Sequence, residues 1–217
     1  MNTIQMNDGT EYTPTKIVGI GRNYVKHIEE MNSTQTEDPV LFIKPNSSLC
    51  DITKPIPIPK NAGSVHHEIE LAVLIGKDGK NIPEKSALDF VMGYGLALDL
   101  TLRDVQNMAK DAGLPWALAK GFDYSCPVST FVNKNQIKDP HNLQLTFSVN
   151  DTVKQDSNTK YMIFKIPVLI SYISKYFTLK KGDIIITGTP AGVGPLKADD
   201  IVEAKIEKIA EIKTSIV

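Results

Sequence analysis

The sequence is poor in cysteine and in long apolar stretches. Its two cysteines, Cys50 and Cys126, have no CxxC spacing and no histidine cluster nearby, which argues against a zinc or redox site. We interpret both as small, buried apolar side chains, and this cysteine usage fits a cytoplasmic protein, or alternatively one of an organelle matrix. The longest apolar stretch, Ile163–Ile173, is interrupted by Lys165 and Pro167 and does not reach the length of a membrane span.

The sequence also lacks a strong charge and the common motifs of nucleotide and hydrolase sites. A net charge of −1 without a basic run argues against nucleic acid as a partner, and the polar segment Met1–Thr15 has no apolar core of a secretory signal. No HExxH or GxSxG motif occurs. Two glycine-rich stretches, Gly19–Tyr24 and Gly188–Pro195, complete neither a dinucleotide fingerprint nor a phosphate-binding loop. The second follows a predicted strand, and its backbone N–H groups could hold a small anion.

The patterns along the chain predict one strand-rich domain. At 217 residues, with 41% hydrophobic and 23% charged residues, a single globular domain is the default expectation. Alternating and apolar runs predict strands at Lys16–Ile20, Val40–Lys44, Val65–Ile75, Met92–Leu100, Leu143–Val149, Ile184–Thr187, Ile201–Ile206 and Glu211–Ile216. Helices are expected at Tyr24–Met31, Leu102–Ala112 and Ile166–Tyr176, the second capped by Thr101. The segments Asn32–Asp38 and Asn150–Thr159 are interpreted as loops. The regular βαβ alternation of a doubly wound sheet is absent, so the predicted class is mixed α+β.

Three acidic residues form the strongest functional signal. Glu68 and Glu70 stand two apart in an alternating strand that we expect to be half-buried, so their side chains share one face about 7 Å apart. Asp99 lies within the apolar run Leu96–Leu100, where a charge is costly unless it is paired or binds a metal. Three carboxylates that need the same counter-charge suggest a hard divalent cation. The alternative is a solvated sheet face, with Asp99 capping the next helix.

Two polar pairs are spaced to face a common site. His27 and Glu30 are three residues apart on a predicted helix, where a carboxylate orients an imidazole and raises its basicity, as a general base requires. Arg103 and Gln106 are three apart on the helix that follows Asp99, and a guanidinium suits a substrate carboxylate. Both pairs also have a simpler interpretation as solvated polar side chains on helix surfaces.

Lys120 follows an apolar run that contains the only tryptophan, Trp116. A desolvated lysine beside a metal site could stabilise a developing enolate or alkoxide. Its alternative is a surface position, reached by extending the aliphatic stem over apolar neighbours.

Taken together, these motifs resemble those of one family. They occur in order from about Ile17 to Val202, and comprise Gly21-Arg22-Asn23-Tyr24 with His27 and Glu30, Phe42-Ile43-Lys44-Pro45, His66-His67-Glu68-Ile69-Glu70-Leu71, Gly93-Tyr94 through Asp99, Arg103-Asp104-Val105-Gln106, Pro115-Trp116 through Asp123, and Gly188-Thr189-Pro190. The chain resembles the fumarylacetoacetate hydrolase superfamily, in particular its short, one-domain acylpyruvase and oxaloacetate decarboxylase branch. The resemblance implies a β-roll like the C-terminal domain of fumarylacetoacetase, with an N-terminal segment (1–15) before a single catalytic domain (16–217), and a homodimer.

The resemblance also implies a set of site residues. One Mg²⁺ or Mn²⁺ per chain would be held by Glu68, Glu70 and Asp99. His27 and Glu30 would belong to a lid over the substrate, a small 2-oxo acid, and Lys120 would join them in catalysis. The expected substrate-binding residues are Arg103, Gln106 and Thr189, which would line the pocket, and Lys44, which would reach its edge.

The activity implied by the resemblance is metal-dependent hydrolysis of acylpyruvates, which gives pyruvate and a carboxylic acid. Oxaloacetate decarboxylation through the same metal-bound pyruvate enolate is a second expected reaction. The alternative is an oxaloacetate keto–enol tautomerase or 2-oxo-acid isomerase, which would use the same base, metal and pocket, so the sequence does not separate these reactions. A non-catalytic 2-oxo-acid sensor would have lost a base or a ligand, whereas all are present here. A plain structural β protein would take up no Mg²⁺.

Overall fold

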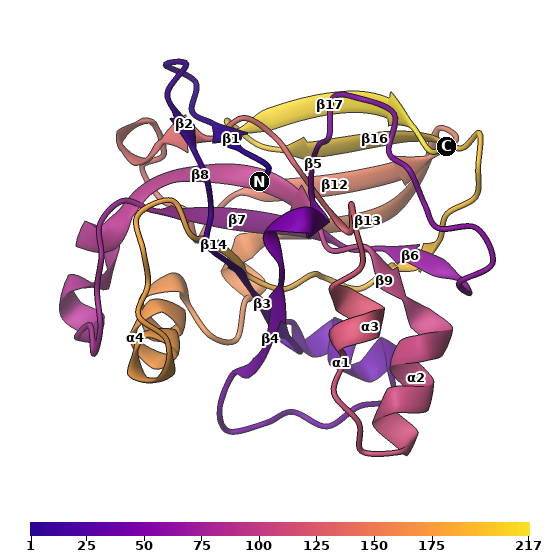
Figure 1. The fold of residues 1–217 in the computed structure, drawn as a ribbon, viewed down its shortest axis with the longest axis horizontal. Coiled ribbons are helices and arrows are strands. Elements are labelled where there is room, and N and C mark those ends of the chain that lie inside the picture. Colours follow the sequence, from indigo (N-terminus) through magenta and orange to yellow (C-terminus); the bar gives the residue numbers. More distant parts are fainter.

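An eight-stranded mixed sheet forms the centre of the structure, a computed structural model that describes residues 1–217 (Figure 1). Its strands follow in the order β4 (Val40–Lys44), β3 (Ile17–Gly21), β14 (Ile184–Ile186), β7 (Ile69–Ile75), β8 (Val91–Leu98), β10 (Cys126–Val128) and β5 (Leu49–Asp51), with β11 (Val132–Asn133) also paired to β8. The pairs β3–β14 and β5–β10 are parallel, and the remaining pairs are antiparallel.

Three smaller sheets surround this centre. A four-stranded antiparallel sheet, in the upper part of Figure 1, contains β13 (Thr152–Asn158), β12 (Gln144–Val149), β16 (Ile201–Ile206) and β17 (Ala210–Ser215). A three-stranded sheet contains β15 (Gly194–Pro195), β6 (Val65–His67) and β9 (Thr101–Leu102), and a two-stranded sheet contains β1 (Ile4–Gln5) and β2 (Glu11–Tyr12). The strand-rich, mixed α+β class predicted from the sequence is therefore confirmed.

The helices are few and short. Three of them lie together at the lower right of Figure 1, namely α1 (Val25–Glu30), α2 (Arg103–Asp111) and α3 (Ala117–Lys120), while α4 (Ile166–Tyr176) lies on the opposite side. Single 3₁₀ turns or short 3₁₀ helices occur at Asn46–Ser48, Glu84–Phe90, Lys134–Gln136 and Thr159–Tyr161. None of the helices has both the length and the apolar character needed to cross a membrane.

Strand β7 separates two apolar cores, which explains its composition. Ile69, Leu71, Val73 and Ile75 belong to the larger core, between the central sheet, the four-stranded sheet and α4. Ala72 and Leu74 belong to a smaller core on the other face. The alternation predicted from the sequence is present, but both faces are covered, so the expectation of a half-buried strand is wrong.

The structure corrects three further predictions. The expected strand Val65–Ile75 is two strands in different sheets, interrupted at Glu68. Thr101 does not cap α2, because it lies in β9 and its hydroxyl donates to the backbone oxygen of Asp99. The segment Asn150–Thr159, interpreted as a loop, contains β13, whose polar residues pair with β12 behind a tight turn. Of the two cysteines, Cys126 is buried and Cys50 only partly so.

Candidate active site

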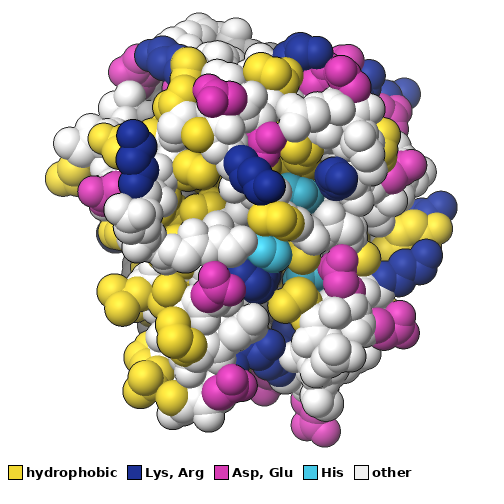
Figure 2. Space-filling model, turned by 90° about the vertical axis from the view of Figure 1, so that its right-hand side faces the viewer, with side chains coloured by type: hydrophobic (Ala, Val, Ile, Leu, Met, Phe, Trp, Pro, Cys, Tyr) yellow, Lys and Arg dark blue, Asp and Glu magenta, His cyan; other side chains and the backbone are white.

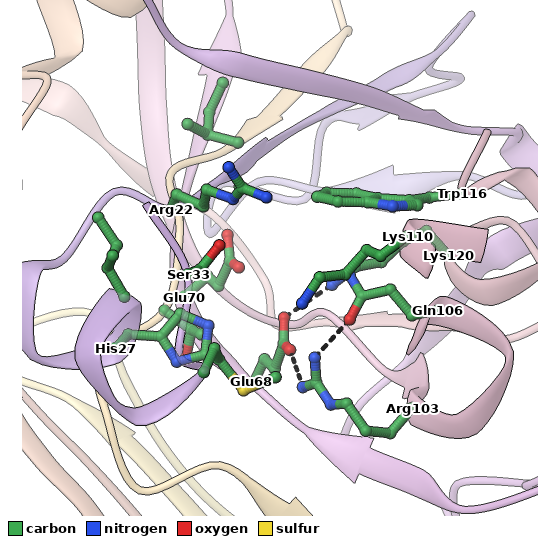
Figure 3. A pocket seen from close by; sticks show the side chains of 15 residues that line it. Arg22, His27, Ser33, Glu68, Glu70, Arg103, Gln106, Lys110, Trp116 and Lys120 are labelled. Atoms are coloured by element: carbon green, nitrogen blue, oxygen red, sulfur yellow. Dashed lines mark hydrogen bonds and ion pairs between the residues drawn. The ribbon is translucent and has the colours of Figure 1, made fainter. Parts of the chain in front are cut away.

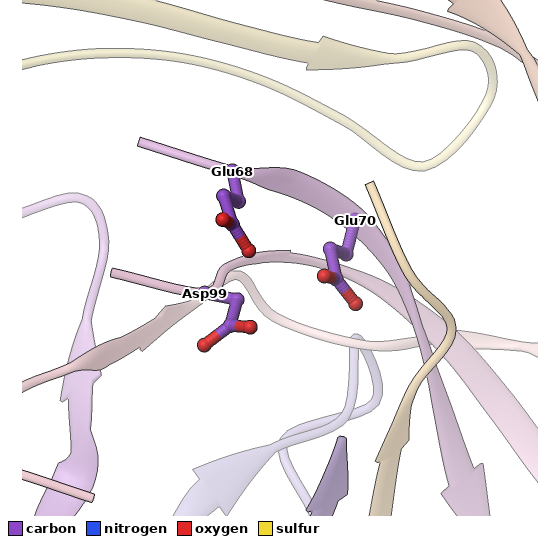
Figure 4. Close-up of side chains that lie close together, drawn as sticks. All are labelled: Glu68, Glu70 and Asp99. Atoms are coloured by element: carbon purple, nitrogen blue, oxygen red, sulfur yellow. The ribbon is translucent and has the colours of Figure 1, made fainter. Parts of the chain in front are cut away.

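The three predicted carboxylates converge where the central sheet meets the three-stranded sheet. Glu70 lies on β7, Glu68 at the break before it, and Asp99 directly after β8. A backbone hydrogen bond of 2.8 Å from Asp99 N to Glu68 O fixes this junction. One oxygen from each side chain lies within 4.8 Å of the others, and all three residues are at most 3% exposed (Figure 4). The alternative of a solvated acidic face is therefore wrong.

Two cations from the neighbouring helices pair with the triad. Nζ of Lys120 lies 2.8 Å from Oε2 of Glu68, 2.5 Å from Oδ2 of Asp99 and 2.7 Å from the Thr101 hydroxyl. Arg103 donates to Oε1 of Glu68. Although burial works against the charged amine, the carboxylates of Asp99 and Glu68 hold the pKa of Lys120 above its ordinary value. The lysine therefore stays protonated, and all three of its N–H groups are engaged.

Lys44 lies behind the triad rather than at the edge of the pocket, where the sequence interpretation placed it. Its side chain is fully buried. Nζ lies 2.8 Å from Oδ1 of Asp99 and 3.0 Å from both the backbone oxygen and the hydroxyl of Ser125. These oxygens replace the water that a buried ammonium group loses. The position of Lys44 suits holding Asp99 in place rather than contacting a ligand.

Glu70 is the carboxylate without a cation. Its Oε2 accepts a hydrogen bond of 2.6 Å from the backbone N–H of Gly188, and it makes no ion pair. Burial first, and then the negative charges of Asp99 and Glu68, raise the pKa of Glu70 well above its ordinary value. Glu68, by contrast, is paired with Lys120 and Arg103, which outweigh burial and lower its pKa. Glu70 is therefore the one carboxylate of the triad with which no cation of the protein pairs.

The residues present fit a divalent cation. Buried polar atoms normally have a hydrogen-bond partner, yet Oδ1 of Asp99, Nε of Arg103 and the Tyr24 hydroxyl have none. Oδ1 of Asp99 does form the ion pair with Lys44, but at angles that are not those of a hydrogen bond. Three carboxylate oxygens are the donor set that Mg²⁺ and Mn²⁺ prefer, and the uncompensated charge of Glu70 is what a cation would neutralise.

An imidazole–carboxylate pair lies across from the triad on α1. Nδ1 of His27 is 3.1 Å from Oε2 of Glu30, and Oε1 of Glu30 accepts a hydrogen bond of 2.9 Å from the backbone N–H of Gly192. Burial acts to raise the pKa of Glu30, but the hydrogen bonds from His27 and Gly192 hold it below its usual value. The glycine is required, because it has φ +99° and a Cβ there would lie 2.0 Å from the backbone oxygen of Lys154.

Most of the predicted site residues line one open cavity, shown in Figure 3. These are His27, Glu68, Glu70, Arg103, Gln106, Lys120 and Thr189. Lys44, Asp99 and Glu30 do not line it, but each contacts a residue that does, namely Lys120 for Lys44 and Asp99 and His27 for Glu30. On the face drawn in Figure 2, histidine side chains gather at the centre beside basic and acidic ones. Eight residues without a predicted role also line the cavity, among them Arg22, Ser33, Lys110 and Trp116.

The hydrogen bonds of Gln106 and Thr189 determine what each can offer a ligand. The amide oxygen of Gln106 lies 2.6 Å from a guanidinium nitrogen of Arg103. Because a guanidinium only donates, the NH₂ group of Gln106 is left for a ligand. The Thr189 hydroxyl donates to the backbone oxygen of Ile69, at 2.9 Å, so its proton is already used. Its backbone N–H donates to no group of the chain.

Gln155, which was not predicted from the sequence, supports this part of the site from β13. Its Nε2 donates to the Thr189 hydroxyl at 2.8 Å and to the backbone oxygen of Pro190 at 2.9 Å. Its Oε1 accepts from the backbone N–H of Ile69 and contacts Nδ1 of His67. The residue is fully buried. No local signal identifies it, because it is the one buried side chain in an otherwise polar strand.

The fold places a buried carboxylate cluster and an imidazole–carboxylate pair at one cavity. Residues 16–217 match the family described as fumarylacetoacetate (FAA) hydrolase C-terminal, and the chain belongs to this family. The resemblance inferred from the motifs, the predicted fold and the prediction of an enzyme are thereby confirmed.

Individual relatives carry more specific names. A mitochondrial oxaloacetate tautomerase of Mus musculus is 51% identical over 197 residues, which are 91% of this chain and 89% of the relative. An oxaloacetate tautomerase of Escherichia coli is 53% identical over 191 residues, 88% of this chain and 87% of the relative. The structure of fumarylpyruvate hydrolase from Pseudomonas aeruginosa, in complex with Mn²⁺ and pyruvate, has a TM-score of 0.95 and 30% identity, with 100% of this chain and 95% of that chain covered.

Proposed function

We propose that this protein is an oxaloacetate keto–enol tautomerase that uses Mg²⁺ or Mn²⁺ at Glu68, Glu70 and Asp99. The observation that carries the proposal is the pairing of a carboxylate-oriented imidazole with an acidic triad across one cavity. The relatives named oxaloacetate tautomerase, at about 50% identity, support this choice over the hydrolysis that the sequence motifs placed first. A bound divalent cation would supply Lewis-acid polarisation of the 2-oxo group.

The side chains of the cavity have distinct tasks in this reaction. Tautomerisation removes one proton from C3 and adds one to the 2-oxo oxygen. His27, held by Glu30, is the group in the cavity suited to take and return the C3 proton. The NH₂ group of Gln106 and the backbone N–H of Thr189 are free to bind the adjacent carboxylate. Lys120 has no free N–H, so it favours the negative charge that develops on oxygen through its own charge.

A second candidate function is cleavage of a C–C bond in an acylpyruvate, with fumarylpyruvate hydrolase from P. aeruginosa as its support. Here His27 would activate a water molecule against the distal carbonyl carbon, and pyruvate would be one product. The same residues bind the 2-oxo acid end in both reactions. The two candidates therefore differ in whether water reaches the substrate.

One set of assays tests both candidates. The purified protein is given oxaloacetate, with Mg²⁺, with Mn²⁺ and with a chelator, and loss of the enol absorbance is followed alongside pyruvate release. The same pyruvate assay is run on acetylpyruvate. Metal-dependent enol loss without matching pyruvate release is the expected result. Faster release of pyruvate from acetylpyruvate would favour the second candidate, and no metal-dependent change in either substrate would refute the proposal.

A replacement of His27 links the reaction to the cavity. His27→Ala should lose activity, whereas Lys26→Ala, on the exposed side of the same helix, should retain it. Equal activities in these two variants would remove the imidazole from the reaction.

A further inference from the structure

Both arginines of this protein line the same cavity. Of its 24 lysine and arginine residues, only Arg22 and Arg103 are arginines, and each contributes to the cavity wall. All other positive side chains, including those of the surface ion pairs, are lysines. Arginine differs from lysine in its planar, fixed fork of N–H donors, which matches a carboxylate in two-point contact. The use of arginine here therefore indicates carboxylate recognition.

The two arginines differ in what they already bind. Arg103 is committed within the protein, because it donates to Glu68 and to Gln106. Arg22 makes one long contact, 3.3 Å from NH1 to the backbone oxygen of Thr34, and no ion pair. Its guanidinium thus retains most of its donors.

The cations of the site differ in whether a carboxylate of the protein pairs with them. At the triad, Lys44, Lys120 and Arg103 all pair with Asp99 or Glu68. Arg22 and Lys110 also line the cavity, and they form no ion pair with any carboxylate of the chain. This part of the cavity wall therefore carries positive charge that nothing in the protein neutralises, so it attracts an anionic group of a ligand.

The backbone on both sides of Arg22 is fixed by packing and hydrogen bonds. Its φ of +59° lies in the left-handed region, which a non-glycine residue adopts at a cost. On one side Gly21 packs so closely that a Cβ would lie 3.2 Å from the Trp116 ring. On the other side the buried Asn23 bonds to the backbone of Phe164 and Thr187. In Figure 3, Arg22 and Trp116 lie along one side of the cavity, opposite Glu68 and Arg103.

We propose that Arg22 binds the second carboxylate of a dicarboxylic 2-oxo acid and thereby selects such substrates over 2-oxo acids with an uncharged far end. The inference rests on the proposed function, which places the 2-oxo acid end at the triad. With that end on the triad, the far carboxylate of oxaloacetate would extend across the cavity to the side where Arg22 and Trp116 lie (Figure 3). Arg22 would then be a specificity-determining residue and not part of the proton transfer.

The first test compares two substrates in the same preparation. The variants Arg22→Gln and Arg22→Lys are assayed with oxaloacetate and with its 4-methyl ester, in which the far charge is removed. We expect kcat/KM for oxaloacetate to fall by at least about 10-fold in Arg22→Gln, the scale of a lost charged hydrogen bond, with the ester nearly unaffected. For Arg22→Lys, kcat/KM for oxaloacetate should lie between the values of the wild type and of Arg22→Gln. Equal losses for both substrates, or no loss for either, would overturn the inference.

The second test measures binding and does not depend on turnover. Affinities of the Mg²⁺-loaded protein for 2-oxoglutarate and 2-oxovalerate are compared by calorimetry, because these acids differ only at the far end. The wild type should prefer the dicarboxylate, and Arg22→Gln should remove that preference. Lys26→Gln, which deletes an equal charge outside the cavity, should keep it. If the preference survives in Arg22→Gln and disappears in Lys110→Gln, the lysine is the anchor and the inference is wrong.

The two tests separate this inference from the proposed function. A wild type that converts neither oxaloacetate nor its ester would refute tautomerisation, while the binding comparison would still decide the role of Arg22. A wild type that converts both without preference, and binds both 2-oxo acids equally, would refute the role of Arg22 alone.

Discussion

Replacing Glu70 by glutamine should stabilise the metal-free protein, although the residue lies at the centre of the site. In the structure Glu70 touches no cation and accepts a single hydrogen bond, from Gly188. Burial and the charges of Asp99 and Glu68 raise its pKa well above the ordinary value. The carboxylate is therefore disfavoured in the folded protein, and glutamine reproduces the neutral form. The glutamine oxygen can still accept from Gly188, and its NH₂ group can donate to the neighbouring carboxylates.

The sign and size of the effect follow from linkage. A carboxyl group whose folded pKa is raised stabilises the fold fully below its unfolded pKa, and that contribution is lost as the pH rises toward the folded pKa. Each unit of difference is about 1.4 kcal/mol. We therefore expect Glu70→Gln to gain about 1–3 kcal/mol over the wild type near pH 8, and less near pH 5. For a chain of this length that gain corresponds to roughly 2–10 °C in Tm.

Thermal unfolding in chelator and in Mg²⁺ checks this prediction. Added Mg²⁺ should stabilise the wild type by about 2.7 kcal/mol at 100 times its Kd, and should leave Glu70→Gln unchanged, so the advantage of the variant seen in chelator should shrink by that amount. The matched control is Glu68→Gln. It removes the partner of Lys120 and Arg103 and should cost about 3–5 kcal/mol. If in chelator Glu70→Gln melts below the wild type and Glu68→Gln does not, Glu70 is not the uncompensated carboxylate of the triad.

Three further replacements test other parts of the site. His27→Ala should lower turnover about 10²–10⁴-fold without changing the Mg²⁺ affinity measured by calorimetry, since the imidazole forms no hydrogen bond or ion pair with a triad residue; a parallel loss of affinity would contradict this. Gln155→Leu should lower the free energy of unfolding in urea by at least about 2 kcal/mol, because it leaves His67, Thr189 and the N–H of Ile69 without their hydrogen-bond partner. The replacement Gln35→Leu, at an exposed position, should leave that free energy nearly unchanged. Lys44→Met should cost about 3–5 kcal/mol by leaving Asp99 short of a buried partner, and the exposed Lys54→Met is its control; a neutral Lys44→Met would show that the lysine is dispensable.

Local patterns predicted the elements whose ends carry a strong signal. The strands Val40–Lys44 and Ile201–Ile206 and the helix Ile166–Tyr176 have the predicted bounds. Pro45 follows the first, and Pro167 in the first turn of the helix marks its start. Strand β13 was missed because six of its seven residues are not buried, so it has no apolar alternation. As an edge strand it is held by backbone pairing with β12 rather than by side-chain burial.

The carboxylate triad was predictable because two of its members are close in sequence and the third lies in an apolar run. Glu68 and Glu70 are neighbours on one strand, and Asp99 stands out within an apolar run. The lysines that pair with these carboxylates could not be assigned from spacing. Lys120 is more than fifty residues from its partner Glu68 in the sequence, and Lys44 is equally far from its partner Asp99. For that reason the sequence placed Lys44 at the pocket edge, whereas the fold places it behind Asp99.

The segment Gly188–Pro195 shows how the fold joins the two halves of the proposed chemistry. From the sequence, its backbone N–H groups were a possible clasp for a small anion. In the structure they hold two carboxylates of the protein itself, Glu70 through Gly188 and Glu30 through Gly192. Both glycines have φ above +90°, a backbone conformation in which a residue with a side chain would be strained. Because one short segment bonds to the triad and to the partner of His27, any shift of it alters the metal-binding and proton-transfer groups together. The spacing of its glycines therefore sets the geometry of the site, although none of their atoms needs to touch the substrate.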